Sequence, residues 1–135
     1  MDLYAETILD HYRHPRGKER LPSPSVTHAE VNLSCGDELT LSLGIHDDHI
    51  RKIGWEGSGC AISQSAMSML GEELEGKSLA EAASLSKDDV YALLGVPVGP
   101  RRIKCALLCL HALKNAVRKF RGEASQGWAE TVGEI

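Results

Sequence analysis

The sequence predicts an α+β fold, in which a small three-stranded antiparallel sheet packs with several helices and a metal site is exposed at one end. Apolar and polar residues alternate between positions 39 and 45, which is typical of a strand with one buried face. After residue 60 the apolar spacing becomes helical. Cysteines 35, 60 and 105 each lie at a predicted bend or at the start of an element, where their side chains can meet.

The composition limits the possible functions. A chain of 135 residues with 42% hydrophobic and 25% charged residues is most simply one globular domain. A net charge of -4 and only 4% aromatic residues argue against nucleic-acid binding. No apolar run is long enough to span a membrane, and the N-terminus lacks the pattern of a secretory signal. We therefore expect a cytoplasmic protein whose four cysteines are metal ligands or reactive thiols.

The first half of the chain contains the predicted sheet. A short helix is expected over residues 2–13, and Pro15 ends it because proline disfavours helix at the residue before it. Residues 16–25 form an irregular connection. Alternation at Ala29, Val31 and Leu33 predicts a first strand, residues 39–45 a second, and Ile53 with Trp55 a third. Cys35 and the following two residues fall in the turn between the first two strands.

The second half is predicted to be helical. Apolar spacing indicates a helix over residues 60–75, and two capping-box patterns beginning at Ser78 and Ser86 open shorter helices. A loop follows over residues 95–100, and the last long helix begins near Arg101 and ends at Gly122. We place the domain at residues 1–121 and predict that residues 122–135 form a flexible C-terminal tail, whose Trp128 could dock on the rest of the protein.

Cysteine chemistry favours a shared site. Cys60 and Cys105 begin predicted helices, where the free N–H groups and the helix dipole stabilise negative charge. Cys35 precedes Gly36, which lets the chain bend around an ion, and Asp37 can add an oxygen ligand. Three thiolates and a carboxylate suit tetrahedral zinc, and thiolates also suit an iron–sulfur cluster. The long gaps between these cysteines are equally compatible with unrelated cysteines of the core.

Cys109 lies one helical turn after Cys105, beside the apolar stripe of the last helix. We interpret it as a small hydrophobic residue of the core, the alternative being a spare sulfur near the site. A disulfide with Cys105 is not expected, because both side chains point along the helix.

At these residues the chain resembles the iron–sulfur cluster assembly scaffold family that includes IscU, SufU and the N-terminal domain of NifU. The resemblance extends from about Tyr4 to Phe120. It is carried by the following segments: Ile8-Leu9-Asp10-His11-Tyr12 with Pro15-Arg16, Cys35-Gly36-Asp37, Gly57-Ser58-Gly59-Cys60-Ala61-Ile62-Ser63, and Arg102-Ile103-Lys104-Cys105-Ala106.

The resemblance implies a scaffold that accepts sulfur from a cysteine desulfurase, assembles a transient 2Fe–2S cluster and transfers it to apo-proteins or carrier proteins. It implies Cys35, Asp37, Cys60 and Cys105 as ligands of the cluster or of a metal, either zinc or iron. Cys35 is the first candidate for the persulfide acceptor, since a turn residue can swing outward, and Cys105 is the second.

Departures from the family pattern leave the subtype open. Leu33 stands where the family commonly has proline. Lys104 stands where the Isc type has histidine, and the absence of this histidine is typical of the Suf type. However, the insertion that the Suf type usually has between the second and third cysteines is missing from this chain. The chaperone-recognition motif is not intact over residues 95–100, which argues against a dedicated Hsp70 partner.

Three hypotheses follow. The first is the sulfur-accepting scaffold, which is not an enzyme. The second is a zinc-dependent sulfurtransferase that relays persulfide from the desulfurase without carrying a cluster, and Lys104 favours it. The third is a structural zinc domain, which would unfold when its metal is removed.

Overall fold

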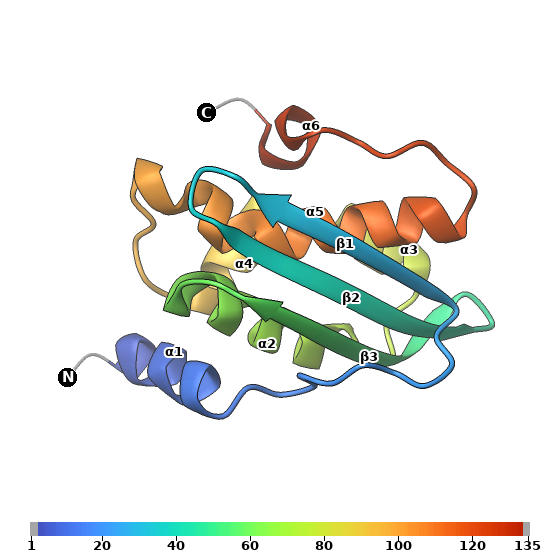
Figure 1. Ribbon diagram of the computed structural model, residues 1–135, viewed down its shortest axis with the longest axis horizontal. Helices are drawn as coiled ribbons and strands as arrows, with labels where there is room; N and C mark the ends of the chain where they lie inside the picture. The colour runs from blue at the N-terminus through green and yellow to red at the C-terminus, as the bar shows by residue number, and fades with distance from the viewer. Residues whose placement is uncertain (1–2, 134–135) are drawn as a thin grey trace.

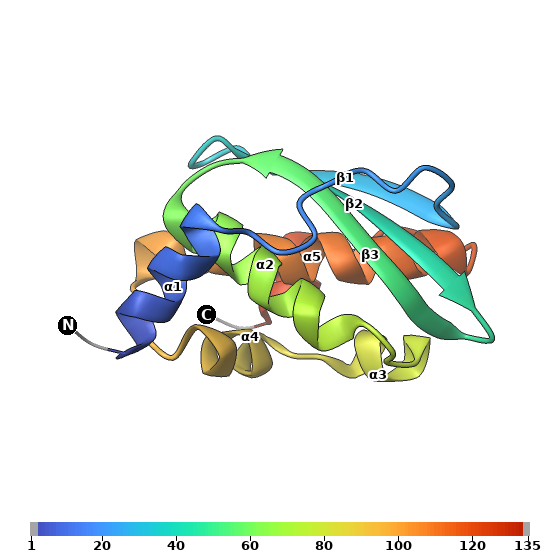
Figure 2. The same cartoon turned by 90° about the horizontal axis from the view of Figure 1, so that it is seen from below.

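The computed structural model of the protein describes residues 3–133. Within them the chain forms one antiparallel sheet with helices gathered on one of its faces (Figures 1 and 2). The elements in chain order are α1 (Leu3–Arg13), β1 (Val26–Asn32), β2 (Asp37–His46), β3 (His49–Ser58), α2 (Ala61–Leu74), α3 (Leu79–Ser84), α4 (Lys87–Leu94), the 3₁₀ turn η1 (Pro100–Arg102), α5 (Ile103–Phe120) and α6 (Trp128–Val132). The predicted α+β class and the three-stranded sheet are confirmed.

The sheet has the order β1-β2-β3, and β2 supplies its most apolar inner face. Leu39, Leu41 and Leu43 are buried on this strand, as the period-2 pattern predicted. Helix α5 packs beneath β1 and β2, and α2 packs beneath β3, so two long helices cover the inner face (Figure 2). This single core of aliphatic residues, with Trp55 among them, fixes the sheet and both helices relative to one another.

The inner face of β1 differs from the sequence prediction. The strand pairs His28 with Leu41 and Glu30 with Leu39, so the polar residues of β1 share the face of the buried leucines. The apolar residues Ala29 and Val31 are exposed on the opposite face instead. A polar inner face is tolerated here because His28 and Glu30 hydrogen-bond to each other at 2.7 Å and Glu30 also accepts a bond from α5.

Both short helices begin where the capping-box patterns predicted. The Ser78 hydroxyl accepts a hydrogen bond from the backbone of Glu81, whose carboxylate accepts one from the Ser78 backbone. Ser86 and Asp89 repeat part of this arrangement at the start of α4. None of the helices within residues 3–133 is long and apolar enough to cross a membrane.

The segment after α5 contains a helix that the sequence pattern did not reveal. Helix α6 lies against α5, and its residues Thr131 and Val132 are buried. Trp128 stacks on His111 of α5, so this residue of the tail does dock on the domain. The domain boundary at residue 121 and the flexibility of residues 122–135 stay predictions, and residues 1–2 and 134–135 lie outside the described part of the chain.

Candidate metal centre

The turn between β1 and β2 presents Cys35 to solvent. The carbonyl of Asn32, the last residue of β1, accepts a hydrogen bond from the Gly36 N–H at 2.9 Å, and its side-chain oxygen accepts one from the Ser34 N–H at 3.3 Å. Gly36 has a φ of 74°, which glycine adopts without the steric penalty of a side chain. Asn32 and Gly36 therefore shape the turn, and Cys35 is the exposed thiol at its end.

Asp37 is the first residue of β2 and is only 1% exposed. Its Oδ1 accepts hydrogen bonds from the Cys60 N–H at 2.9 Å and from the Ser63 hydroxyl at 3.3 Å. The carboxylate thus caps the start of α2, where unpaired N–H groups and the helix dipole favour a negative charge. Because one oxygen is held in this way, Asp37 presents the other in a fixed direction.

Gly59 makes the close approach of Asp37 possible. A Cβ at this position would collide with the Asp37 carboxylate and would crowd the Ser63 hydroxyl. The φ of Gly59 is 155°, a backbone conformation that residues with side chains rarely adopt. The glycine before Cys60 therefore has a physical role in seating the carboxylate.

Cys105 lies in the first turn of α5 and is buried. Its thiol donates a hydrogen bond to the Cys35 sulfur at 3.2 Å, and the Asn32 side-chain amide lies 3.8 Å from the Cys105 sulfur. Burial, followed by the hydrogen bonds with Cys35 and Asp37, raises the pKa of the Cys105 thiol far above its ordinary value. A metal ion would reverse this effect, because it binds the thiolate.

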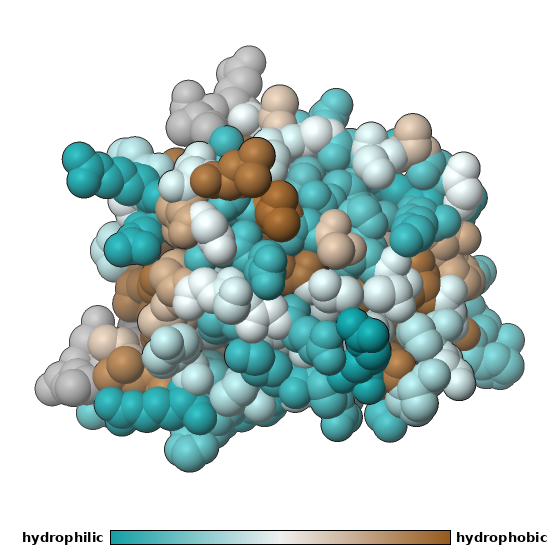
Figure 3. All heavy atoms as spheres, in the orientation of Figure 1, coloured by the Kyte–Doolittle hydropathy of each residue, from teal (hydrophilic) through white to brown (hydrophobic). Residues whose placement is uncertain are grey.

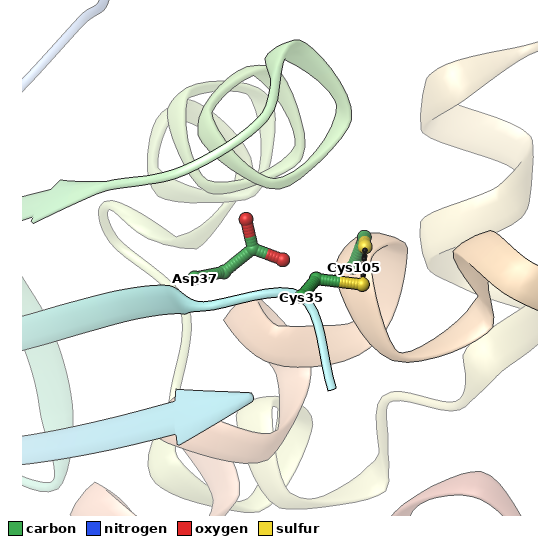
Figure 4. A group of neighbouring side chains, drawn as sticks. All are labelled: Cys35, Asp37 and Cys105. Carbon is green, nitrogen blue, oxygen red and sulfur yellow. Dashed lines mark hydrogen bonds between the residues drawn. The ribbon is translucent and has the colours of Figure 1, made fainter. Parts of the chain in front are cut away.

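The structure thus brings Cys35, Asp37 and Cys105 together from two distant parts of the sequence (Figure 4). One ligand atom from each lies within 4.8 Å of the other two. Two sulfurs and a carboxylate oxygen at this spacing are donors that zinc accepts, and exposed Cys35 leaves a side open to solvent. Within residues 3–133 the predicted metal site therefore has a structural counterpart.

Cys60 takes a different place from the other predicted ligands. It is the N-cap residue of α2, as the sequence predicted, and it is partly exposed. Its backbone N–H contacts Asp37, whereas its sulfur does not belong to the group of three ligand atoms. The Cys60 sulfur still lies close enough to Arg102 to raise the pKa of its guanidinium. The role of Cys60 as a fourth ligand stays a prediction.

Cys109 belongs to the core. It is fully buried, its thiol donates to the Ala106 carbonyl at 3.5 Å, and burial raises the pKa of the thiol to about 12. The interpretation of Cys109 as a small hydrophobic residue is therefore correct.

Arg102 is a residue of the site that the sequence reasoning did not single out. A hydrogen bond to the Cys105 sulfur, together with the nearby sulfurs of Cys60 and Cys35, raises the pKa of the Arg102 guanidinium. Its position three residues before Cys105, at the N-cap of α5, is the signal that could have identified it. The guanidinium supplies positive charge where thiolates would form.

A groove of about 480 Å³ opens beside Cys35. It runs between the β1–β2 turn and the start of α5, and its lining residues are Asn32, Ser34, Cys35, Pro100, Arg101, Ile103 and Lys104. Apolar residues also gather over the end of β1 and the following turn, where Leu33 is 91% exposed (Figure 3). The groove combines apolar walls with the positive charges of Arg101 and Lys104.

An exposed thiol, a buried thiol and a buried carboxylate on this α+β scaffold define a site for thiolate and metal chemistry. The family model described as "NifU-like N terminal domain" matches residues 3–126. The chain belongs to this family, as the resemblance of its cysteine segments indicated.

Known relatives agree with this assignment. The chain is 35% identical to a Bacillus subtilis protein named zinc-dependent sulfurtransferase SufU, over 89% of this chain and 92% of that one. It is 30% identical to an iron–sulfur cluster assembly scaffold protein IscU of Thermotoga maritima, over 87% of this chain and 94% of that one. A crystal structure described as a putative iron–sulfur cluster assembly scaffold protein for the SUF system of Fervidobacterium islandicum superposes with a TM-score of 0.74 at 27% identity, covering 83% of this chain and 94% of that chain.

Proposed function

We propose that this protein is an iron–sulfur cluster assembly scaffold that accepts sulfur from a cysteine desulfurase at Cys35. The observation that carries the proposal is the pairing of exposed Cys35 with buried Cys105 and Asp37 around one point. An exposed thiol can meet a partner, whereas the buried pair can hold what the exposed thiol receives. Cys35 is preferred over Cys105 as the acceptor because Cys105 is enclosed by α5 and the β1–β2 turn.

The transfer step conserves atoms and electrons. The Cys35 thiolate attacks the outer sulfur of the donor's cysteine persulfide, so that a new S–S bond forms on Cys35 and the donor S–S bond breaks. The donor cysteine leaves as a thiolate, and Cys35 now carries the persulfide. The cations of Arg101, Arg102 and Lys104 lie around this position and favour the approach of an anionic sulfur.

The cargo of the scaffold is a transient 2Fe–2S cluster, which we propose is held by Cys35, Asp37, Cys60 and Cys105 and passed to apo-proteins or carrier proteins. Converting the persulfide sulfur to sulfide consumes two electrons, which an external thiol reductant can supply. A carboxylate ligand binds iron less tightly than a thiolate does, and an oxygen ligand at Asp37 therefore suits a cluster that must leave.

A second candidate function is zinc-dependent sulfur transfer without a cluster. The specific observation in its favour is Lys104 beside Cys105, where the Isc type has histidine, which leaves Asp37 as the candidate oxygen ligand of a zinc site. The name of the Bacillus subtilis relative agrees with this reading. Bound zinc would stabilise the thiolate forms of the cysteines at neutral pH.

Anaerobic reconstitution tests the leading proposal. Purified protein is incubated with ferrous iron, cysteine, a thiol reductant and a cysteine desulfurase, and the visible absorbance of a 2Fe–2S cluster is followed. We expect a cluster in the parent protein and in the Cys109→Ala variant, and none in Cys35→Ala. Retention of zinc with no cluster absorbance in the parent protein would reject the scaffold role.

The desulfurase assay separates the two functions. If the zinc-loaded form accelerates desulfurase turnover several-fold and Cys35→Ala abolishes the acceleration while no cluster forms, the protein is a sulfurtransferase. A structural zinc domain would instead unfold on chelation and leave desulfurase turnover unchanged. We place the reaction in the cytoplasm, whose reducing conditions keep free thiols available, and we expect no dedicated Hsp70 partner.

A further inference from the structure

The C-terminal tail reaches the edge of the groove beside Cys35. The Trp128 ring stacks on His111 of α5 with centroids 4.1 Å apart and an interplanar angle of 18°. The ammonium of Lys104 lies 5.8 Å from the centroid of the same ring, which is within the range of a cation–π contact. Trp128 therefore spans two turns of α5, from His111 to the residue that precedes Cys105.

The ring is held in place by a network of polar contacts. Asn115 accepts a hydrogen bond from the Gln126 N–H at 2.8 Å and donates one to the Gln126 carbonyl at 3.1 Å. Thr131 of α6 contacts the His111 ring at 2.6 Å and accepts a bond from the Gln126 side chain at 2.8 Å. Since contacts on both sides of Trp128 anchor the tail to α5, the ring offers Lys104 a fixed surface.

Lys104 is otherwise an exposed residue with a long, mobile side chain. It also lines the groove that contains Cys35. The ammonium of a lysine that samples many rotamers spends little time at any one position. A lysine that contacts an aromatic ring has fewer rotamers available. The contact with Trp128 thus restricts the rotamers of a lysine that lines the groove.

We propose that Trp128 is a positioning residue for sulfur transfer, acting through Lys104. The ring holds the Lys104 ammonium at the groove, where it attracts the anionic persulfide that approaches Cys35. The inference rests on the proposed sulfur-accepting function. It assigns the C-terminal tail a role in the reaction, although the tail itself contributes no ligand to the site.

A double-mutant cycle tests this mechanism. The variants are Trp128→Ala, Lys104→Met and their combination, and the readouts are the kcat and KM of desulfurase-driven sulfur transfer, with the scaffold as the varied substrate. We expect Trp128→Ala to reduce kcat/KM about two- to fivefold, mainly through KM, which is the size of an exposed cation–π contact. In the Lys104→Met background, Trp128→Ala should cause no further loss. Additive losses would overturn the proposal.

Two further variants control for folding and for loss of charge. Trp128→Phe keeps an aromatic ring and should retain most of the transfer rate even if Trp128→Ala loosens the tail. Lys18 lies 5.3 Å from the ring centroid of Trp55, away from the groove, and forms a matched lysine–tryptophan pair. Lys18→Met should leave kcat/KM unchanged, and an equal loss in this variant would contradict a role specific to Lys104.

Amine labelling makes the inference independent of any desulfurase. The rate at which an acylating reagent modifies Lys104 is measured by peptide mass spectrometry in the parent protein and in Trp128→Ala. We expect faster labelling of Lys104 in the variant and equal labelling of Lys18. Unchanged labelling of Lys104 overturns the positioning role, whereas faster labelling without any sulfur transfer in the parent protein overturns the proposed function and the role of Lys104 in it.

Discussion

The sulfurs of Cys35 and Cys105 lie 3.2 Å apart, although 70 positions separate the two residues in the sequence. One thiol is exposed and the other is buried, so an oxidant can reach the pair from one side. We predict that a thiol oxidant such as diamide converts them to an intrachain disulfide, with both thiol hydrogens passing to the oxidant. Mass spectrometry of non-reduced peptides should identify the Cys35–Cys105 link.

Bound zinc should prevent this reaction, because both sulfurs would then be engaged by the metal. Cys109→Ala removes a cysteine that lies in the core and should leave the crosslink unchanged. Preferential formation of a Cys35–Cys60 link would contradict the arrangement in which Cys105 is the nearer partner.

The seat of Asp37 depends on Gly59. Gly59→Ala would drive a methyl group against the Asp37 carboxylate and would strain the backbone. We predict at least a tenfold loss of zinc affinity in a chelator competition, comparable to the effect of removing groups that orient metal ligands. Gly76 has a φ of 89° and open space around it, so Gly76→Ala adds backbone strain without a collision. This control should lower stability and keep zinc affinity, and equal affinity losses in both variants would refute the role of Gly59.

The strand pattern of β2 predicted its buried face, and the cysteine segments predicted two helix starts. The inner face of β1 could not be predicted in this way, because its half-buried Glu30 accepts a hydrogen bond from Asn115 of α5, a distant element. Alternation shows only that apolar residues lie on one face of a strand and polar residues on the other. It does not show which of the two faces points toward the core. The pattern alone therefore could not place His28 and Glu30 inside.

Motif and chemistry predicted that Cys35, Asp37 and Cys105 meet. Motif and chemistry did not predict which residues would contact these ligands. Asn32 and Arg102 contact Cys105, and Ser63 contacts Asp37, only when the turn, α2 and α5 are assembled. Helix α6 escaped prediction for a related reason. Its five residues are too few for a periodic signal, and its position depends on side chains of α5.

Asn115 should be a principal anchor of the C-terminal tail. It is 1% exposed and joins Gln126 to Glu30 through its amide. We predict that Asn115→Leu lowers the free energy of unfolding by about 1–3 kcal/mol, since its half-buried partners Glu30 and Gln126 lose their hydrogen bonds. Urea denaturation measures this loss. Limited proteolysis should show earlier cleavage within the segment that follows Phe120. Ser125→Ala, at an exposed position of the same segment, should change neither, and a tail equally resistant to protease in Asn115→Leu would contradict the prediction.

Buried histidines should make the protein less stable as the pH falls below neutrality. His11 is 7% exposed and contacts the Ser68 hydroxyl at 2.7 Å, and burial lowers its pKa, although Glu72 partly opposes this effect. Burial also lowers the pKa of His111. In an unfolded chain the pKa of a histidine is about 6.5. The unfolded state then binds more protons than the native state below that pH, and its population rises.

We therefore predict that the free energy of unfolding falls as the pH is lowered from 7 to 5.5, by at most about 1.4 kcal/mol per pH unit for each buried histidine. Urea denaturation at several pH values measures the slope. His11→Gln replaces the titrating ring with a neutral amide and should flatten the slope, even if the variant is less stable at every pH. A parent slope of zero, or one that His11→Gln leaves unchanged, would show that His11 does not titrate differently in the folded and unfolded states.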